Sequence, residues 1–181
     1  MKKIIRLFAL ILTVLGATGG AATLYAQNAA GFSLWGGAEA NGYSPTSAGF
    51  GGRIGEDYRF GEQFSFGSSF LLSSDGDFTT LEFSANLRYY LFRNESSLIK
   101  HYNWAAVFHF FVQAEGGAGI FITEDNTPQA LLMGGLAIGS RIALGRLSSF
   151  YIEPYARIGY PYILGVGVLG VYRFPVKGGT W

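Results

Sequence analysis

A two-residue alternation of apolar and polar side chains runs through most of the chain, and it limits the possible folds more than any other feature. It is clearest between residues 81 and 92, where every second residue is apolar: Leu81, Phe83, Ala85, Leu87, Tyr89 and Leu91. Successive side chains of a β-strand point to opposite faces, so this pattern predicts a strand with one apolar and one polar wall. Helical periodicity is scarce, and we therefore expect an all-β protein.

The same alternation predicts seven further strands. Three are clear, at residues 64–73, 108–116 and 151–160, and four Gly-rich ones fall at about 32–41, 48–56, 131–144 and 163–174. Turn-forming residues separate them at 42–45, 61–62, 75–77, 93–97, 124–128, 145–146 and 160–161. Seven connections join eight strands, and an even number of antiparallel strands returns the C-terminus to the side where the chain began. We expect external loops of only about five to nine residues, which is short for an adhesive barrel.

The N-terminus has the organisation of an export signal. Lys2, Lys3 and Arg6 precede a short apolar stretch, residues 7–15, and small residues then lead to Ala26. This order is typical of a secretory signal peptide. We predict a cleaved signal peptide at residues 1–26 and one barrel domain at 27–181. A retained anchor helix is the alternative, but after residue 26 no apolar run approaches the roughly 18 residues that a spanning helix needs.

Charge placement decides which wall of the strands faces inward. Alternation alone fits both a water-soluble barrel with an apolar core and a membrane barrel with an apolar exterior. The predicted strands carry few charges, nearly balanced in sign, and no Lys lies between Lys3 and Lys100. A water-facing wall would carry many more. We therefore predict a closed antiparallel up-and-down transmembrane β-barrel in the bacterial outer membrane, with these charged residues in its lumen: Glu39, Arg53, Glu82, Arg88, Glu115, Arg141, Glu153, Arg157 and Arg173.

Some of these charges have the spacing of cross-strand ion pairs. Directly opposite residues of a hairpin are equidistant from the turn centre and lie about 5 Å apart. Two pairs are centred at predicted turns, Glu39 with Arg53 and Arg141 with Glu153. A third pair, Arg88 with Glu115, is centred near His101, close to the predicted turn at 93–97. The alternative is coincidence, since a turn centre is uncertain by a residue or two.

Aromatic residues cluster near the predicted strand ends, where amphipathic rings would lie at the membrane–water interfaces. The residues assigned to these two girdles are Tyr43, Tyr58, Phe60, Phe64, Tyr89, Phe92, Tyr102, Trp104, Phe150, Tyr160, Tyr162, Tyr172 and Phe174.

Over residues 28–174 the chain resembles the small eight-stranded outer-membrane barrels of the OmpX, OmpW and OmpA-transmembrane-domain kind. The segment 170–174 is similar to the aromatic-ended last strand that the barrel-assembly machinery recognises, although residues 175–181 follow it here. The resemblance implies contact with membrane lipid and with that machinery. It also implies a structural role, adhesion, or passage of small hydrophobic molecules.

The sequence offers little for catalysis or for cofactors. Cysteine is absent, histidine occurs only at His101 and His109, and the net charge of +1 gives no sign of nucleic-acid binding. Lipid A deacylases place a Ser two residues after their His, but here that position is Phe111. We expect a non-enzymatic barrel without cofactor or metal, whose narrow lumen is largely filled by side chains. OmpW-like passage of small hydrophobic molecules, surface binding through short loops, and a soluble periplasmic lipocalin-like barrel are the alternatives.

Overall fold

A computed structural model describes residues 31–44, 47–60, 63–91, 108–123, 128–144 and 149–174 of the chain. The predicted signal peptide, residues 1–26, lies outside this part, as do His101 and the predicted girdle residues Phe92, Tyr102 and Trp104. Among the described residues, no helix is long and apolar enough to cross a membrane.

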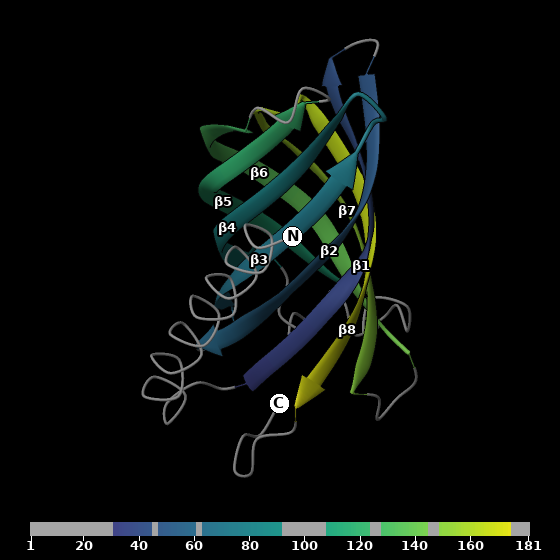
Figure 1. The fold of residues 1–181 in the computed structure, drawn as a ribbon. Helices are drawn as coiled ribbons and strands as arrows, with labels where there is room; N and C mark the ends of the chain where they lie inside the picture. Colours follow the sequence, from purple (N-terminus) through teal and green to yellow (C-terminus); the bar gives the residue numbers. More distant parts are fainter. Residues whose placement is uncertain are drawn as a thin grey trace.

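The described residues form a closed barrel of eight antiparallel strands, each paired with its neighbours in sequence (Figure 1). The strands are β1 (Gly31–Ser44), β2 (Ser47–Phe60), β3 (Phe64–Ser74), β4 (Phe78–Tyr90), β5 (Phe108–Thr123), β6 (Pro128–Ala143), β7 (Phe150–Tyr160) and β8 (Leu164–Phe174). The first and last strands close the barrel, in a register that runs from Phe32 opposite Phe174 to Gly42 opposite Leu164. The predicted fold class and strand number are therefore confirmed.

Three strands that contain several glycines extend further than the alternation predicted. Strand β2 continues to Phe60, β5 continues to Thr123 and β6 already begins at Pro128. Glycine contributes no side chain to the pattern, yet its backbone pairs with the neighbouring strand like that of any other residue. Alternation therefore underestimates strand length where Gly is frequent.

The predicted length of five to nine residues for the external loops is wrong, because the connections at the end of the barrel away from the termini are only two to four residues long. We call the end of the barrel away from the chain termini the distal end. There the strands are joined in pairs by the short segments 45–46, 75–77, 124–127 and 161–163. At the terminal end, where β1 begins and β8 ends (Figure 1), residues 91–107 separate β4 from β5.

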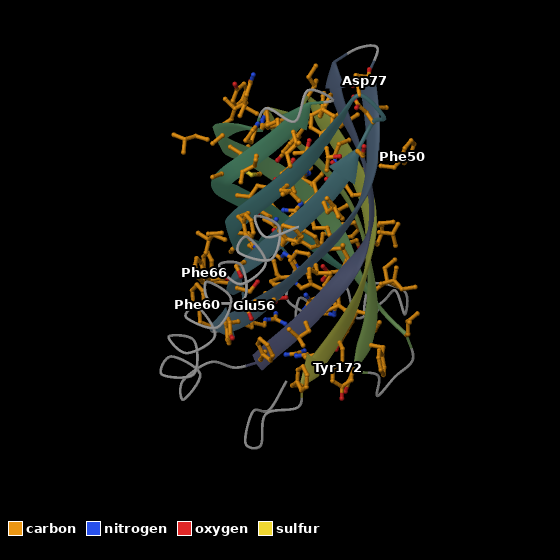
Figure 2. All side chains as sticks on the ribbon, in the orientation of Figure 1. Phe50, Glu56, Phe60, Phe66, Asp77 and Tyr172 are labelled. Atoms are coloured by element: carbon orange, nitrogen blue, oxygen red, sulfur yellow. The ribbon has the colours of Figure 1, made fainter. Side chains whose placement is uncertain are left out.

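The outward wall of the barrel is apolar. Leu132, Phe50 and Leu136 expose 82%, 72% and 60% of their surface, although each belongs to a regular strand. Phe50, Phe66 and Tyr172 all project away from the barrel axis (Figure 2). Charged residues are instead buried within the barrel, which is the reverse of a water-soluble protein. The predicted orientation of the two walls is confirmed.

A belt of aromatic rings runs along the terminal end of this apolar wall, over β7, β8 and β1 to β4. Phe150, Tyr172, Phe174, Phe32 and Tyr58 follow one another with ring centroids between 4.8 and 5.3 Å apart. On the neighbouring strands Phe60, Phe64 and Tyr89 continue the belt at 5.9 and 5.0 Å. Interfacial girdles of this kind set the edge of the hydrocarbon layer.

Two predicted girdle residues, Tyr43 and Tyr162, face the lumen instead. The hydroxyl of Tyr43 is hydrogen-bonded to Ser73 at 2.6 Å, and Tyr162 is fully buried. Both lie near strand ends, so their position in the sequence resembled that of a girdle residue. Near the distal end, the hydroxyls of both tyrosines therefore find their hydrogen-bond partners in the lumen.

Within the described strands, one carboxylate lies on the lipid-facing wall. Glu56 of β2 points outward with Ile54 and Tyr58, near the labelled Phe60 and Phe66 at the terminal end (Figure 2). The hydroxyl of Ser68, its register partner on β3, donates a hydrogen bond to Glu56 at 3.3 Å. Glu56 lies beside the aromatic belt, close to the membrane interface. A polar group on the lipid-facing wall destabilises a barrel less there than at the middle of the membrane.

Candidate functional site: the charged lumen

All nine charged residues predicted for the lumen lie on the inward faces of their strands. Eight of them are buried, and Arg173, near the terminal end, is half-buried. They form two groups along the barrel axis. The distal cluster contains Arg53, Arg157, Glu39, Glu82 and Glu115; the proximal cluster, nearer the termini, contains Arg88, Arg141, Asp57 and Glu153.

Arg157 is the centre of the distal cluster. Its guanidinium approaches Glu39 at 2.5 Å, Glu82 at 3.0 Å and Glu115 at 2.9 Å. These carboxylates come from β1, β4 and β5, while Arg157 itself belongs to β7. The ring of Tyr162 lies against the guanidinium, 3.6 Å from its central carbon. A single side chain thus connects strands from opposite sides of the barrel.

Arg53 completes the distal cluster from β2. Its guanidinium approaches Glu115 at 2.6 Å and Glu39 at 3.4 Å, and it donates to the hydroxyl of Ser69 at 3.0 Å. Arg53 and Arg157 therefore share two of the same carboxylates, Glu39 and Glu115. Shared, fully desolvated ion pairs of this kind hold a side-chain network in one arrangement.

The proximal cluster is built around Glu153 of β7. Its carboxylate accepts hydrogen bonds from Arg88 of β4, at 3.0 and 3.2 Å, and from Arg141 of β6. Arg141 also approaches Asp57 of β2 at 3.5 Å. Gln113 joins the two clusters, because it accepts from Arg88 at 2.9 Å and donates to Glu115 at 3.2 Å.

Two of the three predicted hairpin pairs are present in the structure. Arg53 approaches Glu39, although the register places Glu39 opposite Gly51, two residues away. Arg141 contacts Glu153. The predicted pair of Arg88 with Glu115 is wrong: the register sets Arg88 opposite Gln113, and the guanidinium reaches across the lumen to Glu153.

Several members of the network were missed by the sequence analysis. Asp57 lay beyond the predicted end of its strand, and extending the alternation by one residue would have placed it in the lumen. Tyr155 donates to Glu39 and Tyr162 donates to Glu115. The alternation of residues 151–160 does place Tyr155 on the polar wall with Glu153 and Arg157, but spacing cannot show that its partner is Glu39. Tyr162 follows the predicted turn at 160–161, and the sequence analysis assigned it to a girdle.

Aromatic and aliphatic side chains fill the lumen around the two clusters. Trp35, Tyr90, Phe111, Tyr155, Leu169 and Val171 form one buried group. Phe111 packs under the guanidinium of Arg88, with 4.1 Å between its ring centroid and the central carbon. Tyr43, Phe78 and Phe121 contact one another near the distal end, with centroids between 5.0 and 6.0 Å apart. The inward Trp35, Phe111 and Leu71 therefore act as packing inside the barrel.

The chemistry available to this lumen is charge pairing. Among the described residues, no group of three or more His, Asp and Glu side chains is placed to hold a metal ion. His109 faces inward on β5, opposite Arg141 in the register with β6. The buried carboxylates Glu153 and Glu115 accept hydrogen bonds from guanidinium, amide and phenol groups.

Comparison with solved structures identifies the same fold in small outer-membrane barrels. The chain matches the crystal structure of Neisserial surface protein A with a TM-score of 0.61 and 14% identity, covering 81% of this chain and 97% of that one. It matches the N-terminal β-barrel domain of Pseudomonas aeruginosa OprF with a TM-score of 0.51 and 12% identity, covering 80% and 99%.

No family model matches the chain, and the search of curated proteins found no match either. The fold resemblance expected from the sequence is confirmed: this is a closed eight-stranded barrel of the outer-membrane type.

Proposed function

We propose that this chain is a non-enzymatic barrel of the bacterial outer membrane, in which it serves as a structural element with a lumen closed to bulk water. The apolar outer wall and the aromatic belt support the membrane location, because only lipid covers such a surface favourably. Membrane lipid is then a partner along the whole outer wall. The barrel-assembly machinery is a second partner, through the closing strand β8 that ends at Phe174.

One observation carries the proposal of a closed lumen: ion pairs cross it from one side to the other. Arg157 to Glu82 and Arg88 to Glu153 both join β7 to β4, each at 3.0 Å. Arg53 to Glu115 joins β2 to β5 at 2.6 Å. A solute passing along the axis would have to separate these buried charges, and breaking one such pair costs about 3–5 kcal/mol.

Planar-bilayer recording tests this proposal. The refolded barrel is expected to insert without producing a stable, large conductance at neutral pH. A double variant, Arg53→Ser with Glu115→Ser, serves as the comparison. It removes both charges of one ion pair that crosses the lumen, and it should show a higher conductance than the unmodified barrel. Stable large steps from the unmodified barrel would contradict the closed lumen.

Cell fractionation tests the location. The chain is expected in the outer-membrane fraction, requiring detergent for extraction and migrating differently on a gel before and after boiling. Release without detergent would favour the soluble alternative instead. We also propose that residues 1–26 are removed on export. Mass spectrometry of the intact protein from the outer membrane should then give the mass of a chain that begins at Gln27.

A further inference from the structure

Glu56 is a charged residue on a wall that is otherwise apolar. Within the described strands, the outward wall carries this one carboxylate and no Lys or Arg. Ile54 and Tyr58 flank Glu56 on β2, and its register partners are Leu34 on β1 and Ser68 on β3. A charge on the lipid-facing wall destabilises a barrel. A cation from the surrounding membrane would neutralise it.

Two hydroxyl groups hold the carboxylate of Glu56 in place. Ser68 donates a hydrogen bond to its Oε1 atom at 3.3 Å, and the phenol of Tyr58 is a second hydrogen-bond partner. The two oxygens of a carboxylate offer about four acceptor positions, so two hydroxyls leave room for further donors. Glu56 is only half-buried, unlike the carboxylates of the lumen, and a molecule outside the barrel can therefore reach it.

The aromatic belt places this carboxylate at the level of lipid headgroups. Tyr58 belongs to the belt, with 4.8 Å between its ring centroid and that of Phe32, and tyrosine hydroxyls favour the headgroup layer. The Cα atom of Glu56 lies two residues further along the tilted strand, roughly 5 Å deeper. A glutamate side chain spans that depth by extending toward the interface. Its hydrogen bond with Tyr58 therefore keeps the carboxylate near the headgroups.

We propose that Glu56 binds the ammonium group of a phosphatidylethanolamine headgroup at the terminal end of the barrel. This inference rests on the proposed membrane location. A primary ammonium carries a positive charge and three N–H donors, so it neutralises the carboxylate and also fills its remaining acceptor positions. The half-exposed rings of Phe60 and Phe66 lie beside Glu56 (Figure 2), and aromatic faces attract cations.

Three other occupants fit this position less well. A calcium ion takes six to eight oxygen ligands, and the described outward wall offers it one carboxylate and two hydroxyls. A choline headgroup has the charge but no N–H to donate. A second copy of the barrel would bring the same outward wall, whose described strands present no Lys or Arg to pair with Glu56.

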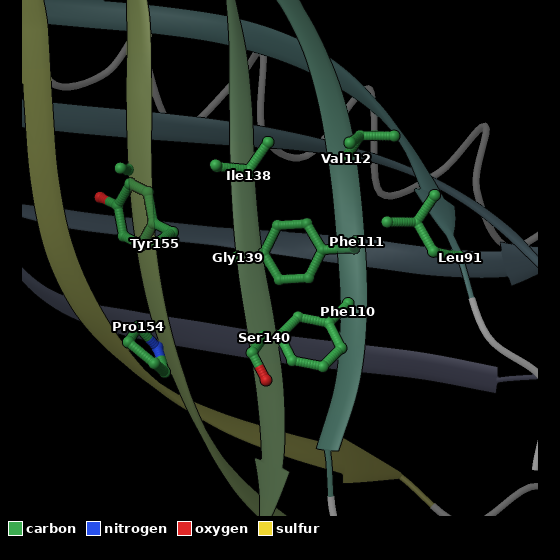
Figure 3. Close-up of a pocket in the computed structure, with 10 residues that line it drawn as sticks. Leu91, Phe110, Phe111, Val112, Ile138, Gly139, Ser140, Pro154 and Tyr155 are labelled. Atoms are coloured by element: carbon green, nitrogen blue, oxygen red, sulfur yellow. The ribbon is translucent and has the colours of Figure 1, made fainter. Parts of the chain in front are cut away.

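A groove elsewhere on the outward wall provides a comparison without charge. It lies between β5, β6 and β7, has a volume of about 630 Å³ and is lined largely by apolar side chains such as Phe110, Val112 and Ile138 (Figure 3). Ala156 of β7 lies along one side of it. No Asp or Glu belongs to the lining of this groove, so lipid contact there depends on acyl chains and is insensitive to the headgroup.

Native mass spectrometry of the refolded full mature chain tests the proposal. Phosphatidylethanolamine and phosphatidylcholine with identical acyl chains are offered in equal amounts, so that only the ammonium group differs. The wild-type barrel should retain phosphatidylethanolamine about fivefold more tightly, the factor expected for one hydrogen bond. Glu56→Gln keeps the size of the side chain without its charge, and it should bring this ratio close to one. Glu56→Lys should instead retain phosphatidylglycerol, an anionic lipid, in preference to phosphatidylethanolamine.

Matched variants distinguish Glu56 from the rest of the barrel surface. Asp77→Asn makes the same chemical change at an exposed carboxylate of the distal turn, and it should keep the wild-type ratio of the two lipids. Ala156→Phe fills the apolar groove and should keep that ratio as well. Anomalous migration before boiling confirms that each variant is folded.

Three outcomes would overturn the inference. The first is a ratio near one for the folded wild type, and the second is a wild-type ratio in the folded Glu56→Gln variant. The third is a dimer that Glu56→Gln dissociates, which would assign the carboxylate to a contact between two copies of the chain. Each of these results leaves the membrane location intact. A wild-type chain that remains soluble without detergent would instead contradict the proposed function itself.

Discussion

At the scale of single residues, the most demanding feature is the burial of Arg157. Its side chain is 1% exposed and contacts three carboxylates in the lumen. A guanidinium suits this place because its planar, permanently charged fork can serve several oxygens at once. Lysine offers a compact charge with less directional donors, so it would not replace these contacts.

Replacing Arg157 with Ala should therefore destabilise the barrel more than any surface change. It leaves Glu39, Glu82 and Glu115 with only the guanidinium of Arg53 between them, and we expect a loss of at least about 3 kcal/mol in the free energy of unfolding. The free energy of unfolding of Arg157→Lys should lie between those of Arg157→Ala and the wild type. Urea titration in lipid vesicles, followed by tryptophan fluorescence, measures each difference.

The control for this prediction is Asp77→Ala, which removes an exposed carboxylate from the distal turn and should change the free energy of unfolding by less than about 0.5 kcal/mol. Equal stabilities for Arg157→Ala and Asp77→Ala would show that the distal cluster contributes nothing to folding.

At the scale of elements, neighbouring strands approach most closely where glycine faces the lumen. A Cβ built on Gly117 of β5 would overlap the backbone carbonyl of Phe83 on β4. A Cβ on the adjacent Gly116, which faces outward, would have its nearest neighbour at 3.9 Å. The close approach of β4 and β5 therefore requires glycine at position 117, whereas position 116 has room for a side chain.

We expect Gly117→Ala to impair folding and Gly116→Ala to be tolerated. The first must separate β4 from β5, and a cost of about 1–3 kcal/mol is typical of such overpacking. The yield of the fast-migrating form on unboiled gels after refolding measures the effect. Similar yields for both variants would mean that the two strands can part without penalty.

The turn between β3 and β4 is held by a different element-level contact. The carboxylate of Asp75 accepts hydrogen bonds from the backbone N–H groups of Asp77 and Phe78, each at 3.0 Å, and from the hydroxyl of Ser47 at the start of β2. Slight burial raises the pKa of Asp75, but the hydrogen bonds from Ser47 and the backbone outweigh it and hold the pKa below the ordinary value of 3.8.

This lowered pKa gives the turn a defined pH dependence. A carboxylate whose folded pKa lies below its unfolded value contributes stability above the unfolded pKa, and this is lost as the pH falls through the folded pKa. Wild type should therefore lose stability relative to Asp75→Asn below about pH 4. At pH 7, Asp75→Ala should cost roughly 0.5–1 kcal/mol. Urea titrations from pH 7 to pH 3 measure the free energy of unfolding of each variant. If the difference between wild type and Asp75→Asn were the same at every pH, the hydrogen bonds to the Asp75 carboxylate would not stabilise the turn.

At the scale of the whole molecule, the barrel is inverted, with charges inside and exposed apolar side chains outside. Leu136 lies on the outward wall near the middle of β6, and Leu144 lies just beyond the terminal end of that strand; both are more than half exposed. Exposure of this kind is favourable only where the surrounding medium is itself apolar.

Arginine substitutions at these two positions should therefore differ. Leu136→Arg is expected to destabilise the membrane-folded barrel by about 2–4 kcal/mol, whereas Leu144→Arg, near the interface, should cost about 1 kcal/mol or less. Folding titrations in phospholipid vesicles measure the two values. If neither substitution had an effect, the outer wall would be in contact with water.

Sequence alternation was sufficient to predict the class of fold, the number of strands and the wall that carries the charges. Hairpin spacing also predicted the contact of Glu39 with Arg53, because both residues belong to adjacent strands joined by a short turn. It failed for Arg88 because spacing describes only neighbouring strands. The partner of Arg88, Glu153, lies on β7, which does not pair with β4.

The sequence by itself therefore determined which residues share a wall, since that follows from the two-residue period of any strand. Only the tertiary structure decided which charges meet across the lumen and where Tyr43 and Tyr162 point. The reason is geometric: closing the sheet brings together strands that are far apart in sequence, and their meeting points depend on the tilt and stagger of the whole barrel.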